Sequence, residues 1–265
     1  MKIWYQSSSS YGYEPVFDKY GKTLEEQCKR ILRPDTEVHV SGIPVMIREV
    51  AVYKSLVYYQ TIQSLNNMLK AEREGYDAFV IGCTVDMGLE EGKSLINIPV
   101  VGISETSYHL AMTLGRLFAV VTTLPHLVQV YAEEVERYGL CSRYLPGPYV
   151  FPASEEELAI ALDNPKPIMT KFAATAEKAI ADGASVIIPS PGFLATLAYK
   201  SGLTEVQNAL VLDTISVAVK TAEMLVDLKK IGIEPSRRPG IYALPDTKFL
   251  GESLEKLKRV FRIEY

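Results

Sequence analysis

Short hydrophobic runs alternate with longer stretches in which apolar side chains recur at the spacing of a helix. The short runs predict β-strands at residues 3–6, 37–40, 78–82, 100–103, 117–122, 185–188 and 209–212. Helical spacing fills the intervals and is clearest at residues 51–73, 126–138 and 168–182. Residues 79–81 are apolar without interruption, which is typical of parallel strands buried on both faces. This alternation predicts an α/β fold with right-handed crossovers.

The same order of strand, turn, helix, strand and helix occurs twice. One strand ends at the turn Gly82-Cys83, and another ends about a hundred residues later at Ser190-Pro191-Gly192. We therefore expect two pseudo-symmetric lobes, each a mostly parallel sheet flanked by helices, with the active site in the cleft between them. The predicted division is a discontinuous first lobe, a second lobe and a C-terminal extension: residues 1–113 plus 210–232, residues 114–209, and residues 233–265. The extension contains an amphipathic stretch, either a helix packed on the outside of the fold or a subunit contact.

Composition narrows the function classes. The chain has 265 residues, enough to bury a sizeable core, and is 48% hydrophobic and 23% charged. Its net charge of −4 is unlike that of proteins that bind nucleic acid or anionic membranes, and we expect neither partner. The amino terminus shows no signal-peptide core and no stretch is long enough to span a bilayer, so we expect a cytoplasmic protein. Three separated cysteines and three scattered histidines predict neither disulfides nor a metal site.

Cys83 is the main candidate for chemistry. It follows an apolar strand and precedes a predicted helix, where free N–H groups and the helix dipole favour a thiolate that acts as a base or nucleophile. The alternative is a small buried hydrophobic residue. Thr84 is expected either to contact substrate or to cap the helix, and Asp86 is interpreted as a helix-start residue rather than an acid. Gly82 allows the tight turn and belongs to the predicted binding site.

The other strand ends supply the remaining candidates. Their polar groups suit binding of a carboxylate or carbonyl oxygen, although each also suits an ordinary turn. The predicted substrate-binding residues at these ends are Gln6, Ser7, Ser8, Thr122, Thr123, Pro191 and Gly192, and Ser190 is the candidate catalytic group of the second turn. Arg48 and His126 lie in loops expected on the cleft side, and Glu105 begins a helix from which it could reach the thiol.

Five segments, in the same order along the chain, resemble the aspartate/glutamate/hydantoin racemase superfamily, most closely its hydantoin racemase branch. Residues 82–89 (GCTVDMGL) resemble the first catalytic turn of that branch. The others are residues 99–105 (PVVGISE), 114–123 (LGRLFAVVTT), 181–188 (ADGASVII) and 213–223 (DTISVAVKTAE). The resemblance covers roughly residues 1–232.

The resemblance implies cofactor-independent chemistry at a carbon beside a carbonyl, with two cysteines facing each other across the substrate. One cysteine is present as Cys83, and the second position falls at Ser190 or Pro191. Serine lacks the acidity of a thiol and proline has no side-chain proton to transfer. Two-thiol racemisation therefore does not fit the second turn.

These observations predict a cofactor-independent racemase or isomerase that acts on a small carboxylate, amide or hydantoin-like compound through Cys83. The alternatives are a single-cysteine hydrolase or decarboxylase of the same superfamily and a non-catalytic small-molecule binding protein. We expect a homo-oligomer that uses no cofactor and no metal.

Overall fold

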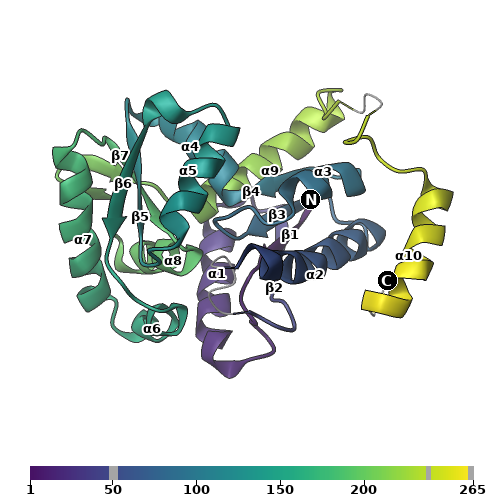
Figure 1. Cartoon of the computed structure of the whole chain (residues 1–265), viewed down its shortest axis with the longest axis horizontal. Helices are drawn as coiled ribbons and strands as arrows, with labels where there is room; N and C mark the ends of the chain where they lie inside the picture. The colour runs from purple at the N-terminus through teal and green to yellow at the C-terminus, as the bar shows by residue number, and fades with distance from the viewer. Residues whose placement is uncertain (48–52, 237–239, 262–265) are drawn as a thin grey trace.

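The protein consists of two α/β lobes that lie side by side (Figure 1). The computed structural model describes residues 1–47, 53–236 and 240–261. Each lobe is an open, mostly parallel sheet flanked by helices, so the predicted fold class is confirmed. The candidate Arg48 lies outside the described residues. No helix in the described part of the chain is both long and apolar enough to cross a membrane.

The first lobe has a four-stranded parallel sheet in the order β2-β1-β3-β4. Its strands are β1 (Lys2–Ser7), β2 (Glu37–Ser41), β3 (Ala78–Gly82) and β4 (Val100–Gly102). Its helices are α1 (Asp18–Ile31), α2 (Lys54–Arg73), α3 (Leu89–Leu95) and α4 (Ile103–Leu114), with a short 3-10 turn at Pro15–Phe17. Every residue of β3 is buried, as its unbroken apolar sequence predicts for a central parallel strand.

The second lobe has a five-stranded sheet in the order β6-β5-β7-β9-β8. Its strands are β5 (Phe118–Thr122), β6 (Tyr144–Val150), β7 (Val186–Ser190), β8 (Glu205–Val206) and β9 (Ala209–Val211). Its helices are α5 (Leu127–Arg137), α6 (Glu155–Ile160), α7 (Lys166–Ala181) and α8 (Gly192–Ser201), with 3-10 turns at Cys141–Arg143 and Ala161–Asp163. Only β8 runs antiparallel to its neighbour.

The structure differs from the predicted elements in three places, one of them the short strand β8, which was not expected. Strand β6 was not expected, because its sequence contains Pro146, Gly147 and Pro148 and so lacks an apolar run. The helix expected directly after Cys83 is wrong, because residues 84–88 form a turn and α3 begins only at Leu89. Left-handed backbone at Asp86 (φ 42°) and Gly88 (φ 81°) prevents a helix from starting earlier.

Helix α9 (Thr214–Lys230) joins the lobes. Strand β9 pairs with β7 of the second sheet, and the chain then crosses back so that α9 packs on α4, β3 and β4. The Asp213 carboxylate caps α9 by accepting from the Ser216 N–H at 3.0 Å, and it also accepts from the Gln27 side chain of α1 at 2.7 Å. The lobe boundaries drawn from the sequence stay predictions.

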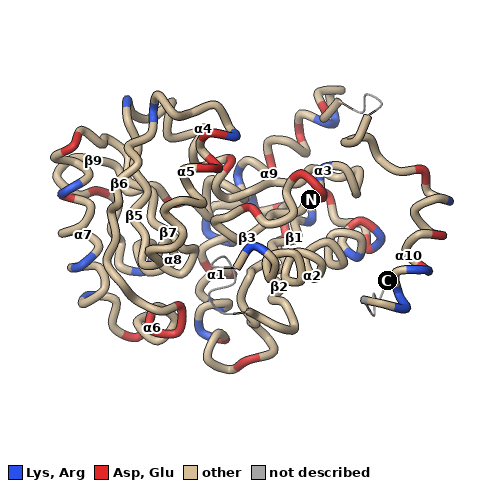
Figure 2. The backbone as a smooth tube through the Cα atoms, viewed as in Figure 1, with Lys and Arg blue, Asp and Glu red and all other residues tan. Residues whose placement is uncertain are grey.

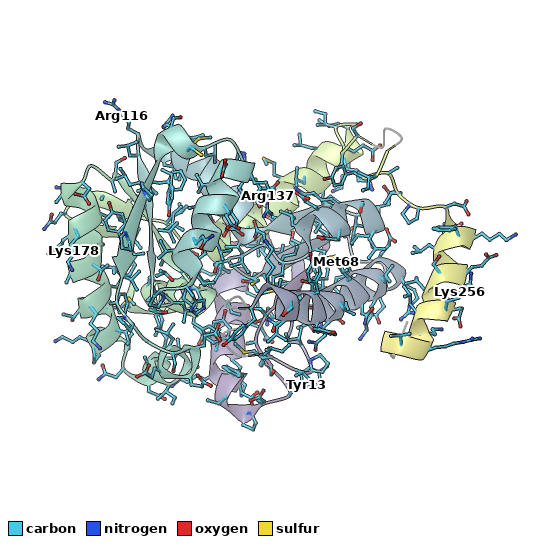
Figure 3. All side chains as sticks on the ribbon, viewed as in Figure 1. Tyr13, Met68, Arg116, Arg137, Lys178 and Lys256 are labelled. Atoms are coloured by element: carbon cyan, nitrogen blue, oxygen red, sulfur yellow. The ribbon has the colours of Figure 1, made fainter. Side chains whose placement is uncertain are left out.

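The two lobes share buried apolar contacts. One hydrophobic cluster contains Tyr5 and Phe17 from the first lobe and Ile187 and Phe193 from the second. Figure 3 shows Met68 of α2 inside the first lobe, where its side chain is fully buried, while the side chain of Lys178 points to solvent. Because the shared core runs through the junction, the carboxyl ends of the two sheets are held at a fixed separation.

Helix α10 (Thr247–Phe261) stands apart from both lobes (Figure 1). Its apolar side chains Phe249 and Val260 are 66% and 71% exposed. Figure 2 shows lysine and arginine positions concentrated toward its carboxyl end. The predicted amphipathic stretch is therefore helical.

Candidate active site

The carboxyl ends of the central strands of both sheets meet at one pocket. In the first lobe Ser7 pairs with Gly82, so the chain leaves the sheet at Ser8 and Cys83. In the second lobe Thr122 pairs with Ser190, so the chain leaves the sheet at Thr123 and Pro191. Binding sites of open α/β sheets lie beyond these strand ends.

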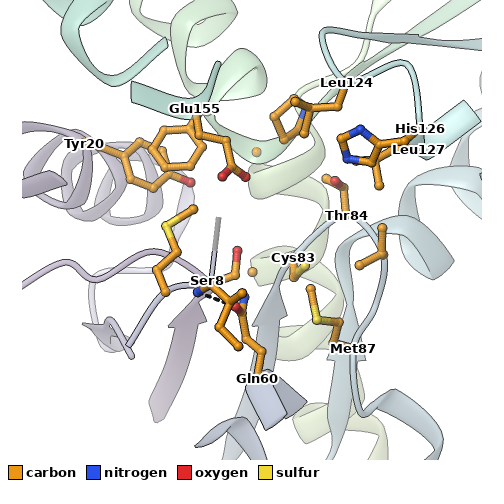
Figure 4. Close-up of a pocket in the computed structure, with 17 residues that line it drawn as sticks. Ser8, Tyr20, Gln60, Cys83, Thr84, Met87, Leu124, His126, Leu127 and Glu155 are labelled. Atoms are coloured by element: carbon orange, nitrogen blue, oxygen red, sulfur yellow. Dashed lines mark hydrogen bonds between the residues drawn. The ribbon is translucent and has the colours of Figure 1, made fainter. Parts of the chain in front are cut away.

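Residues from both turns line this pocket (Figure 4). It therefore brings together part of the predicted site: Ser8, Gly82, Cys83, Thr84, Pro191, Gly192 and the loop candidate His126. It adds residues that the sequence did not single out: Tyr20, Met46, Gln60, Met87, Leu124, Leu127, Glu155 and Phe193. The sequence around Glu155 signals only a helix start, through the capping box of Ser154 and Glu157.

Five other predicted site residues do not line the described part of the pocket: Gln6, Ser7, Thr122, Thr123 and Ser190. All five are buried. The Gln6 amide donates to the backbone oxygens of Ser7 and Ser41 at 2.9 and 3.1 Å, and the Thr122 hydroxyl accepts from the Leu124 N–H at 3.2 Å. These side chains hold the strand ends in place behind the pocket wall.

Ser190 connects the two lobes through hydrogen bonds. Its hydroxyl donates to the Thr84 hydroxyl at 2.9 Å and accepts from Tyr131 of α5. With its hydroxyl engaged on both sides, Ser190 positions Thr84, the residue next to Cys83, rather than facing the pocket. Gly82 is the last paired residue of β3 and Ser190 is the last paired residue of β7, so Cys83 and Pro191 each come directly after a strand.

Burial dominates the electrostatics of Cys83. The pKa of the thiol is raised to about 12, mainly by burial and also by the nearby Asp86 and Glu134 carboxylates, although hydrogen bonds from the Val85 N–H and the Ser8 side chain act to lower it. The expectation of a lowered pKa is therefore wrong. The structural reason is that burial in the pocket wall disfavours the charged thiolate, and a turn rather than a helix amino terminus follows the sulfur. In this structure Cys83 is a neutral thiol at neutral pH.

The Asp86 side chain caps a helix, as expected, but the helix is α4, which begins at Ile103 in a later part of the chain. The Asp86 carboxylate accepts from the backbone N–H groups of Ser104 and Glu105 at 3.1 and 2.7 Å and from the Tyr138 hydroxyl at 2.9 Å. Burial raises its pKa to about 6, against the opposite effect of these three hydrogen bonds. A side chain at Gly102 would approach the carboxyl to 2.5 Å, so a glycine is required there. The carboxylate thereby fixes the turn that presents Cys83.

Glu105 is directed away from the thiol. Its carboxylate pairs with the Lys93 ammonium at 2.6 Å, and neither residue lines the pocket among the described residues. The His109 ring contacts the Glu105 backbone oxygen at 2.6 Å. The structure therefore gives no support to the expectation that Glu105 reaches the Cys83 thiol.

The second lobe presents the amino terminus of α8 to the pocket. Pro191 is the N-cap, and Gly192 and Phe193 of the first turn line the wall. The first N–H groups of a helix have no acceptor within it and favour negative charge. The Tyr20 hydroxyl lies 3.2 Å from where a side chain of Gly192 would begin, and the Tyr20 ring stacks on Phe193 with centroids 3.9 Å apart.

The arrangement supports acid–base chemistry at carbon. A thiol lies on one side of the pocket, and helix N–H groups that stabilise a developing enolate lie on the other. Within the described residues, no group of three or more histidine, cysteine, aspartate or glutamate side chains is arranged to hold a metal ion.

Comparison with known sequences gives consistent names. A family model described as Asp/Glu/Hydantoin racemase matches residues 19–222. The hydantoin racemase of Pseudomonas sp. (strain NS671) is 30% identical over 258 residues, which cover 90% of this chain and 92% of the relative. The hydantoin racemase of Rhizobium meliloti is 30% identical over 165 residues, 61% of this chain and 65% of the relative.

Comparison with solved structures shows the same fold. The allantoin racemase of Klebsiella pneumoniae superposes with a TM-score of 0.75 at 23% identity, covering 93% of this chain and 94% of that chain. The allantoin racemase of Pseudomonas fluorescens superposes with a TM-score of 0.72 at 25% identity, covering 92% and 97%. The protein therefore belongs to the Asp/Glu/hydantoin racemase family of isomerases.

Proposed function

We propose that this protein inverts a stereogenic carbon in a small hydantoin-like ring without a cofactor, and that Cys83 exchanges the proton on one face of the ring. The observation that carries the proposal is the position of Cys83 in the pocket between the two lobes, at the carboxyl end of β3. The names of the hydantoin racemase relatives support the reaction class and a cyclic ureide as substrate.

The pocket suits a small neutral ring with polar edges. Met46, Met87, Leu127 and Phe193 provide apolar walls. The Gln60 side-chain oxygen accepts from the Ile47 N–H at 3.0 Å, which leaves the amide N–H groups as donors to a ring carbonyl. Deprotonation beside that carbonyl places negative charge on its oxygen, and the first N–H groups of α8 stabilise such charge.

A second candidate function is one-sided chemistry by a single thiol, as in a decarboxylase or hydrolase. The observation that favours it is Pro191, which follows β7 directly as Cys83 follows β3 and has no side-chain proton to transfer. A hydrolase would need Cys83 as a nucleophile, and the raised pKa of the thiol opposes that role.

Deuterium exchange separates these functions. Single enantiomers of 5-substituted hydantoins are incubated with the protein in deuterated water containing a chelator and no added cofactor, then analysed by chiral chromatography with mass spectrometry. We expect deuterium in both enantiomers and a final 1:1 mixture. Consumption of the ring without inversion would indicate a hydrolase or lyase, and thermal stabilisation by the ring without exchange would indicate a binding protein.

A further inference from the structure

The wall opposite Cys83 needs a proton-transferring group of its own. Inversion through an enolate requires one group to remove a proton from one face and another to deliver a proton to the other face. Pro191 cannot do this, and the Ser190 hydroxyl is engaged by Tyr131 and Thr84. The second group must therefore come from elsewhere in the pocket.

Three other titratable side chains line the described part of the pocket, namely Tyr20, His126 and Glu155. Burial raises the pKa of Tyr20 far above its ordinary value, so its hydroxyl stays protonated. His126 lies beside Thr84 in Figure 4, next to the turn that carries Cys83, where the pocket adjoins a second cavity lined by α2, α3 and α5. Its position is lateral to the thiol rather than across from it.

Glu155 lies across the pocket. It is the first residue of α6, in the second lobe, and Figure 4 shows its carboxyl directed into the open pocket on the side opposite Ser8 and Cys83. The start of α6 is fixed by a reciprocal capping box, in which Glu157 N–H donates to Ser154 Oγ at 3.2 Å and Ser154 N–H donates to the Glu157 carboxylate at 2.6 Å. A charged carboxylate is favoured in the first turn of a helix.

We propose that Glu155 is the catalytic residue that exchanges the proton on the face of the substrate opposite Cys83, an inference that rests on the proposed function. The Glu155 carboxylate takes the proton from the C–H bond on its face, and the bonding electron pair passes into the adjacent carbonyl as an enolate. The Cys83 thiol then gives its proton to the opposite face of the same carbon. The inverted product leaves behind a protonated Glu155 and a Cys83 thiolate.

This assignment agrees with the protonation state of the thiol. Because the pKa of Cys83 is raised to about 12, the resting residue is a proton donor, and the base has to be a different group. The state left after one turnover, with a thiolate and a carboxylic acid, is the one that converts the opposite enantiomer. Proton exchange with water also restores the resting state.

The test compares Glu155→Gln, Cys83→Ala and the control Glu156→Gln in the deuterium assay. Glu156 is the next residue of α6 and does not line the described part of the pocket. We expect Glu155→Gln and Cys83→Ala each to lower inversion at least 100-fold, which is the scale of one general acid–base group. Cys83→Ala retains the Glu155 carboxylate and should still exchange deuterium into one enantiomer without inverting it, whereas Glu155→Gln retains only the protonated thiol and should exchange much more slowly. Glu156→Gln should invert at the wild-type rate.

Further variants make the result decisive. Glu155→Asp keeps a carboxylate and should recover part of the inversion, and melting temperatures establish that every variant is folded. Inversion by Glu155→Gln at the rate of Glu156→Gln would overturn the assignment while leaving the proposed function intact. A 100-fold loss of inversion in His126→Gln but not in Glu155→Gln would also overturn it. Absence of exchange in the wild-type protein would instead refute the proposed function, and the role of Glu155 with it.

Discussion

The turns that end β3 and β7 have the same backbone plan but different chemistry. Gly82 ends β3 and is followed by Cys83, whereas Ser190 ends β7 and is followed by Pro191. A side chain at Gly82 would meet the Tyr5 ring at 2.5 Å and the Gln6 backbone oxygen at 2.7 Å, so the first turn admits only glycine there. The second turn has room for Ser190 and uses its hydroxyl to connect the lobes. Pseudo-symmetry therefore extends to the backbone and not to the reactive groups.

The helices that follow the two turns also differ, because only one of them begins at the pocket. Helix α8 begins at Gly192, directly after the second turn, so its amino terminus reaches the pocket. Five residues of turn separate Cys83 from the start of α3, and the Asp86 carboxylate in that turn caps α4 instead. The lobe that carries the sulfur thus lacks the helix dipole that would stabilise a thiolate. The lobe without the sulfur supplies the groups suited to stabilising an enolate.

The largest expected effect comes from removing the thiol. Cys83→Ser should lower the rate of hydantoin inversion by about 100-fold or more, because a serine hydroxyl neither donates nor accepts the proton as readily as the thiol. Cys141→Ser, at an exposed cysteine, is the matched control and should keep the wild-type rate. Equal rates in the two variants would show that the chemical difference between the turns has no catalytic meaning.

The next effect concerns the stability of the first turn. Asp86→Asn should lower the free energy of unfolding by about 2 kcal/mol at neutral pH. Three groups donate hydrogen bonds to the carboxylate, and the NH₂ group of asparagine is itself a donor, so one of the three would lose its acceptor. Urea unfolding monitored by circular dichroism measures the change. Tyr138→Phe, which removes only one donor, should cost less. If Asp86→Asn left the free energy of unfolding unchanged, the turn would be held by other contacts.

Asp86→Asn should also change how the free energy of unfolding depends on pH. The folded-state pKa of Asp86 is about 6, above its ordinary value of 3.8, so the folded protein retains this proton more tightly than the unfolded chain. The stabilisation that the folded protein gains from binding this proton is fully present below pH 4 and is lost as pH rises through 6. The free energy of unfolding of the wild-type protein should therefore fall with this increase in pH by more than that of Asp86→Asn. Parallel pH profiles would contradict the raised pKa.

A smaller effect is expected in the second turn. Ser190→Ala removes a hydrogen bond to Thr84 and one from Tyr131, and should lower the free energy of unfolding by about 1 to 2 kcal/mol. Because Ser190 acts through Thr84, inversion should fall less than tenfold and deuterium should still enter both enantiomers. Loss of exchange on one face alone would make Ser190 a direct proton donor and would reverse our interpretation.

The smallest effect tests the surroundings of the sulfur. Ser8→Ala removes a hydrogen bond that lowers the pKa of Cys83, so the pKa should rise and the thiolate fraction at a given pH should fall. Alkylation of Cys83 by iodoacetamide, followed by peptide mass spectrometry with Cys141 as internal reference, should slow a few-fold. Faster alkylation would show that increased access outweighs the lost hydrogen bond.

Much of the architecture was predictable because the signals are local. The seven strands predicted from short β-rich runs all form, and the central strand β3 has the unbroken apolar sequence that a strand buried on both faces needs. Strand β6 escaped prediction because its prolines and glycine conceal it. The position of Cys83 at a strand end was also predictable, because a short apolar run that meets a turn marks the carboxyl edge of a sheet.

The sequence by itself thus determined the fold class, the family resemblance and the residue most suited to proton transfer. The tertiary structure decided that Pro191 and Glu155 line the same pocket as the thiol and that Ser190 connects the lobes. It also decided that burial raises the pKa of Cys83. The physical reason is that periodicity reports only which face of an element is buried. Which residues meet across the lobes, and how far water is excluded there, depends on contacts between segments about a hundred residues apart.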